Sequence, residues 1–160
     1  RRFRTNTVLV VDGTLVPTRD HTVAERSKNY RYSTNHQIVI DAVTRRVAVV
    51  GRPLPGNRND CKVWAPSGAK DAVGRTTVIA DGGYRGTGLV IPHRCERGQS
   101  ELPAWKEEHT ASRRQVRARV EHAFARMKTW KILRDCRLKG DGVHQAMSGI
   151  AHLHNLALGR

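Results

Sequence analysis

Apolar residues in the first part of the chain gather in short runs that predict β-strands. Four of these runs are rich in β-branched residues and bounded by turn-forming residues: 7–11, 37–43, 46–51 and 76–80. A weaker run at 88–92 predicts a fifth strand. The polar step AVTRR between the second and third runs predicts a hairpin, so these two strands are expected to be antiparallel neighbours.

Helical periodicity follows in the second part of the chain. Residues 111–130 and 142–158 each place their apolar side chains on one stripe, at about 100° per residue. Before them, after a loop rich in proline and glycine, Asn59 or Asp60 is expected to cap a short helix. The order strand, hairpin, helix, strand, strand, helix, helix predicts the α/β class, with a mixed sheet flanked by helices. With 160 residues, the chain is expected to form a single domain.

The charge of the chain indicates what it binds. Lys and Arg number 29 against 14 Asp and Glu, which gives a formal net charge of +15. Such an excess predicts a polyanionic partner, most simply a nucleic acid bound in a salt-dependent way. Apolar runs far shorter than the about 20 residues of a membrane span predict a cytoplasmic protein without a membrane partner. Three widely spaced cysteines without a CxxC pair predict neither a disulfide framework nor a zinc site.

Two aspartates share one sequence setting. Asp12 in VLVVDGTLVP and Asp81 in TVIADGGYRG both follow an apolar strand and precede glycine. A charged residue at the end of a buried strand is tolerated when it is paired or holds a metal. Because α/β folds build their sites at strand ends, the two carboxylates are expected to converge if their strands are neighbours.

A third carboxylate lies in the first predicted long helix. Glu121 in RARVEHAFARMK is at the edge of the apolar stripe, with Arg117 and Lys128 within about 40° of it on the helix surface. Two aspartates and a glutamate suit Mg²⁺ or Mn²⁺, which prefer oxygen ligands. Two such ions about 3.5–4 Å apart support phosphodiester cleavage. Taken singly, each acid also fits a helix cap, a turn or a surface ion pair.

Four motifs together resemble a known family. VVDGT with Asp12, PLPGNRND with Asp60, ADGGYRG with Asp81, and RxxxExxxxxxK with Arg117, Glu121 and Lys128 are similar to motifs of the DDE superfamily endonucleases. These are the catalytic domains of bacterial insertion-sequence transposases related to the Harbinger type. The similarity extends over about residues 7–157.

The resemblance implies a ribonuclease H-like fold and a DNA-cleaving, DNA-joining enzyme that acts at transposon ends. It implies that Asp12, Asp81 and Glu121 bind two Mg²⁺ or Mn²⁺ ions, and that Arg117 and Lys128 contact DNA phosphates. Arg114 stands where relatives often have a tyrosine. The implied partners are transposon-end and target DNA, with a homodimer as the active complex. Relatives carry an N-terminal helix-turn-helix segment, so residues 1–160 are expected to be a fragment that lacks it.

Further basic residues are expected to bind DNA, and two interpretations stay open beside the enzyme. Lys28 and Arg31, interleaved with Tyr30 and Tyr32 before a strand, fit phosphate contact and base stacking about as well as a solvated hairpin edge. The remaining candidates are Arg114 and Lys131. Trp130 at a helix end is expected to be core rather than a stacking platform. The rivals are a non-catalytic nucleic-acid-binding protein and a decayed transposase fragment.

Overall fold

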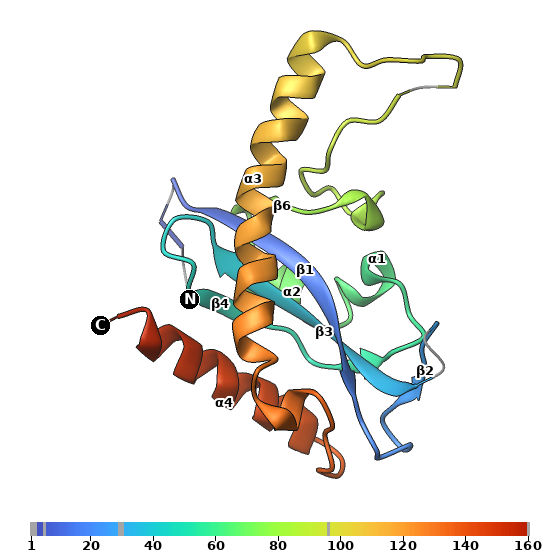
Figure 1. The fold of residues 1–160 in the computed structure, drawn as a ribbon, viewed down its shortest axis with the longest axis vertical. Coiled ribbons are helices and arrows are strands. Elements are labelled where there is room, and N and C mark those ends of the chain that lie inside the picture. Colours follow the sequence, from blue (N-terminus) through green and yellow to red (C-terminus); the bar gives the residue numbers. More distant parts are fainter. Residues whose placement is uncertain (1–2, 5, 29–30, 96, 160) are drawn as a thin grey trace.

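A six-stranded mixed sheet forms the centre of the molecule (Figure 1). The computed structural model describes every residue except 1, 2, 5, 29, 30, 96 and 160. Strands β1 (Val8–Pro17) and β3 (Tyr32–Asp41) form a long antiparallel ribbon. Strand β6 (Thr77–Ile79) runs parallel to β1 on its other side. Strands β2 (Glu25–Arg26), β4 (Val47–Val50) and β5 (Leu54–Pro55) all pair with β3.

Helices cover both faces of this sheet. Side chains alternate along β1, so that Val10 packs with helices α3 (Ala104–Met127) and α4 (Gly142–Ala157). Its neighbour Val11 packs on the other side with α1 (Asp60–Val63), α2 (Ala69–Val73) and the 3₁₀ helix η1 (Gly82–Tyr84). Two separate apolar clusters result, one on each face. The predicted α/β class with a mixed sheet and flanking helices is therefore confirmed.

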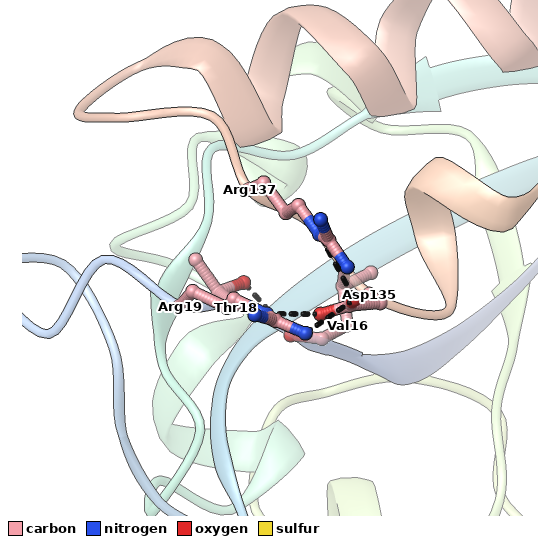
Figure 2. Close-up of polar contacts among 5 residues, drawn as sticks. All are labelled: Val16, Thr18, Arg19, Asp135 and Arg137. Atoms are coloured by element: carbon pink, nitrogen blue, oxygen red, sulfur yellow. Dashed lines mark hydrogen bonds and ion pairs between the residues drawn. The ribbon is translucent and has the colours of Figure 1, made fainter.

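The end of β1 is tied to the segment that follows α3. A second 3₁₀ helix, η2 (Lys131–Leu133), leads into this segment, where Cys136 N–H donates to the carbonyl of Pro17 (2.8 Å). Beside it, the guanidinium of Arg19 binds both carboxylate oxygens of Asp135, at 2.8 and 2.9 Å, and Arg137 approaches the same carboxylate (Figure 2). These contacts hold the C-terminal end of α3 beside β1.

Several element boundaries differ from the predicted ones. The predicted hairpin is present, but β1 and β3 are longer than expected because their polar halves pair with each other as far as Pro17 and Ser33. Residues 88–92 do not form the predicted fifth strand: only Val90 makes a single bridge, to Ile79. Helix α3 begins at Ala104 rather than at the predicted residue 111. Its first turns extend past the sheet (Figure 1) and have no buried apolar stripe, so the apolar pattern could not predict them.

Two side chains have other surroundings than predicted. The predicted short helix is present and Asn59 occupies its N-cap, as expected, but the Asn59 side chain makes no capping hydrogen bond. Trp130 is 49% exposed rather than core, because α3 ends at Met127 and Trp130 begins the surface turn η2. Tyr30 lies outside the described residues. All three cysteines are free thiols, and no helix in the described part of the chain is long and apolar enough to cross a membrane.

Candidate active site

The register of β1 and β6 brings two aspartates together. Val10 is the partner of Ile79, and Asp12 and Asp81 each follow these residues by two positions. Asp81 lies just beyond the end of β6, with only Ala80 between it and the strand. Asp12 is not at a strand end, because β1 continues alongside β3 to Pro17. It lies instead just beyond the last residue of β1 that pairs with β6, so this edge of β1 has no neighbouring strand at Asp12.

Both carboxylates are oriented by backbone amides. Gly13 N–H donates to Asp12 Oδ1 (2.9 Å), and Gly83 N–H, at the start of η1, donates to Asp81 Oδ1 (2.7 Å). Burial, together with the negative charge of Asp81, raises the pKa of Asp12 to about 6. The Gly13 amide and the Arg117 guanidinium oppose this shift. The pair therefore carries more negative charge than its surroundings readily stabilise.

Helix α3 brings two cations to this pair. Asp12 is on the same face of β1 as Val10 and Val16, which pack against α3. Arg117 Nη2 lies 3.8 Å from Asp81 Oδ2, and the Nε of Arg117 is buried without a hydrogen-bond partner. Burial lowers the pKa of Lys128, while the charge of Asp12 raises it. Arg117 and Lys128 thus supply positive charge beside the aspartates.

Glu121 is not joined to the aspartate pair. It lies between Arg117 and Lys128 on one side of α3, within about 40° of each. Its side chain is exposed and makes no hydrogen bond or ion pair within the part of the chain that the structure describes. Nor do the described residues include a group of three or more His, Cys, Asp or Glu placed to hold a metal ion. The structure therefore brings together two of the three predicted acids.

A buried polar network supports the site from the opposite face of β1. Tyr84 O–H donates to Gln37 Oε1 (2.5 Å), and the Gln37 amide donates to Asp60 Oδ1 (3.1 Å). Asn35 donates to the same Asp60 oxygen at 2.8 Å. A side chain at Gly13 would collide with this carboxylate, so the glycine lets Asp60 lie against the backbone of β1. The network links the Asp81 loop, β3 and α1.

Sequence reasoning did not find this network, although a signal for it existed. The segment YSTNHQIVID places polar residues in a strand whose positions 33 to 40 are all buried. Buried polar side chains need partners. The triplet Asn35, His36 and Gln37 therefore indicated that something polar would cover β3.

A basic groove begins at Gly13, the residue that follows Asp12, on the side of β1 where Asp60 lies. One depression is lined by Gly13, Asp60, Arg26, Lys28 and Arg58, among others. A second continues from it through Leu15 and Ser27 to a basic end formed by Arg31, Lys128 and Arg134. Three of the predicted DNA-binding residues, Lys28, Arg31 and Lys128, thus line one continuous surface.

The other predicted DNA contacts lie elsewhere. Arg114 on α3 and Lys131 in η2 are exposed but do not line this groove. The ring of Tyr32 is already stacked on His21, with a centroid distance of 3.6 Å, and Arg26 lies over it. Sequence reasoning missed Arg26, Arg58 and Arg134, whose only signal was their charge.

The chain belongs to the family of transposase DDE domains, whose family model matches residues 4–156. The resemblance to DDE-type insertion-sequence transposases is thereby confirmed. In a comparison with curated proteins, the chain is 80% identical over 158 residues to a putative transposase for insertion sequence element IS112 from Streptomyces albus G. The match covers 99% of this chain and 62% of that protein, so the chain spans less than two thirds of its relative. No solved structure matches.

Proposed function

We propose that this chain is the catalytic domain of an insertion-sequence transposase that cleaves and joins DNA phosphodiester bonds with divalent metal ions. The observation that supports this most strongly is that Asp12 and Asp81 each lie two residues beyond the paired residues Val10 and Ile79 of two parallel strands, with the cations of α3 beside them. The mixed sheet with helices on both faces agrees with the ribonuclease H-like fold that we assign to it. Residues 1–160 are the single domain that carries this activity.

The aspartate pair is suited to hold a divalent cation. Each aspartate accepts a backbone N–H with Oδ1, and Oδ2 of Asp81 lies 3.8 Å from Arg117 Nη2. Mg²⁺ and Mn²⁺ prefer such oxygen donors, and a cation would relieve the repulsion that raises the pKa of Asp12. Glu121 is the proposed third ligand, which reaches the pair by a change of side-chain rotamer. Held by Asp12, Asp81 and Glu121, two such ions would activate a water or hydroxyl and would stabilise the leaving oxygen.

The remaining residues bind and orient DNA in this proposal. Arg117 and Lys128 neutralise phosphates beside the aspartates, and Lys28 and Arg31 extend the contact along the groove. Arg114 on α3 and Lys131 in η2 contact the phosphate backbone of the DNA outside the groove. The partners are transposon-end and target DNA, the active complex is a homodimer, and the protein acts in the cytoplasm, at the nucleoid when bound.

A second candidate is a non-catalytic nucleic-acid-binding protein, either by origin or by decay of a transposase. The observation that favours it is the exposed Glu121, which contacts neither aspartate in the described structure. In that case, the basic groove alone carries the function.

The deciding experiment compares Asp81→Asn with wild type. The substitution keeps the side-chain shape but removes a charge, so we expect Mg²⁺- or Mn²⁺-dependent nicking of DNA to be abolished while binding without metal persists. The assay uses this chain and also a version extended to the length of the IS112 relative. Glu121→Gln is run in parallel, and it is expected to lose nicking to the same extent. Equal nicking by Asp81→Asn and wild type would overturn the assignment of Asp81, and no nicking by wild type in the extended version would support the non-catalytic candidate.

A further inference from the structure

A small cavity lies on the side of α3 that faces away from the aspartates. Helix α3 contributes Arg119, His122 and Arg126, which are between about 140° and 200° around the helix from Arg117. The turn between β3 and β4 contributes Arg45, and α4 contributes His154. The cavity has a volume of about 190 Å³.

The charge in this cavity has one sign only. Three arginines and two histidines line it, and no Asp or Glu is among its lining residues. None of the three arginines has an ion-pair partner within the described part of the chain. Converging cations without a counter-charge repel each other, and a bound anion removes that repulsion. The lining therefore favours an anionic ligand.

Hydrogen bonds hold the cavity in shape. The guanidinium of Arg119 donates to the carbonyl of Ala42, which fixes α3 to the turn. Nε2 of His154, a residue only 8% exposed, donates to the carbonyl of Arg45 (3.2 Å). Asn155 binds the backbone of Val47 on both its N–H (2.7 Å) and its C=O (2.8 Å). The turn is thus attached to both helices.

Arg45 has an unusual backbone conformation. Its φ is 61°, and among the described residues it is the only non-glycine with a positive φ. Glycine or asparagine adopts this conformation more readily. Arg45 lines the cavity in spite of the conformational cost of this backbone, which favours a functional role for its side chain.

We propose that this cavity binds a backbone phosphate of a DNA segment distinct from the one at Asp12 and Asp81. Arginine forks match phosphate oxygens in geometry and charge. A cavity of about 190 Å³ has room for a phosphate group but not for a base pair, and exposed Arg126 and His122 open it to the surface. The DNA identity of the ligand rests on the proposed function. The anion site itself does not.

The test uses the double variant Arg45→Asn with Arg126→Gln. Asparagine tolerates the backbone of position 45, and Arg126 is exposed, so the fold is expected to persist. The control is Lys70→Gln with Arg75→Gln, which removes the same charge at exposed positions of α2 and the loop after it, on the other face of the sheet. If the double variant melts earlier than the control, Arg126→Gln alone replaces it.

Two measurements decide the outcome. In salt titrations of DNA binding, the cavity variant is expected to bind about tenfold more weakly than wild type and to flatten the slope of log K against log salt by about one unit. The control is expected to change the slope by less than half of that. In titrations with short duplexes, wild type is expected to bind a second duplex that the variant loses.

Inorganic phosphate separates the sources of the anion. Phosphate that stabilises wild type and control against heat, but not the variant, supports the anion site. If this occurs while variant and control bind DNA equally, the cavity takes free phosphate and the DNA proposal is overturned. Equal behaviour in all assays overturns the site altogether. Nicking by Asp81→Asn is independent of these readouts, so failure of the proposed activity is distinguishable from failure of this inference.

Discussion

The two sides of α3 carry similar numbers of cations but differ in what faces them. Arg117 and Lys128 face Asp12 and Asp81, so their charge is compensated within the protein. On the other side, Arg119, His122 and Arg126 of α3 line a cavity with Arg45 and His154, and no acid is among its lining residues. The comparison shows that charge alone does not define a site. The side of α3 on which acids and bases meet is suited to bind a metal cation together with DNA. The side on which basic residues have no acidic partner is suited to bind an anion alone.

The largest expected effect concerns Asp12. Its pKa is about 6 in the folded protein against 3.8 in the unfolded chain, so the folded state binds more protons between these values. Stability therefore falls as pH rises from about 4 to about 6 and stays low above that. We expect Asp12→Asn to raise the free energy of unfolding at pH 7 without metal, by on the order of 1–3 kcal/mol.

Chemical denaturation at pH 4.5 and pH 7 checks this prediction. The difference between Asp12→Asn and wild type should shrink at the lower pH, and Mg²⁺ should stabilise wild type only. A variant that is less stable than wild type at both pH values would show that Asp12 is compensated already.

The next effect concerns the compensating cation itself. Arg117→Met keeps much of the buried apolar stem but removes the charge beside Asp81. We expect it to cost on the order of 1–3 kcal/mol without metal, because the two aspartates then lose the guanidinium that opposes their mutual repulsion. Mg²⁺ should restore more stability to this variant than to wild type in thermal melts. Arg113→Met on the same helix serves as a control, and an equal response of the two variants to Mg²⁺ would contradict the prediction.

A smaller effect is expected at the other cation of this side. Lys128→Ala removes one phosphate contact from the groove, so the slope of log K against log salt should flatten by about one unit. The aspartates are untouched, and Mg²⁺ should still stabilise the protein. Salt titrations by fluorescence anisotropy measure the slope, with Lys70→Ala on the far face as control. An unchanged slope would exclude Lys128 from the DNA-binding surface.

The smallest effect comes from adding an acid to the uncompensated side. His122→Glu places a carboxylate one helical turn before Arg126 and close to Arg119. We expect a gain of about 0.3–0.5 kcal/mol in stability from these pairs, together with weaker DNA binding. Thermal melting curves measure the stability of the variant, and fluorescence anisotropy on the same preparation measures its DNA binding. Tighter DNA binding by this variant would mean that the cavity does not receive a phosphate.

The sequence predicted most of the fold for a physical reason. Apolar periodicity reports which residues are buried, and it located the segments of β4, β6 and α4 and the hairpin between β3 and β4. It failed where burial does not follow that pattern. The polar half of β3 is buried by Asp60 and Tyr84, and the first turns of α3 contain no buried side chain. Hence these two boundaries could not be read from the pattern.

The candidate site divides in the same way. Asp12 and Asp81 were identified from sequence because each follows an apolar strand, and the parallel pairing of β1 with β6 placed them at matching positions. Glu121 was predicted from its helix position and the family resemblance, and its place beside the aspartates stays a prediction. The position of Asp60 against Gly13 depends on a contact between segments far apart in the chain.

Most strand and helix segments, the two aspartates and the strong positive charge could be predicted from the chain alone, because they depend on neighbouring residues or on composition. Which charges meet depends on the tertiary structure. It paired Arg117 with Asp81, whereas Arg45, Arg119 and Arg126 have no acidic ion-pair partner among the residues that the structure describes. The reason is that electrostatic partners lie within a few ångströms in space while their positions in the chain differ by tens of residues, and no local pattern records that separation.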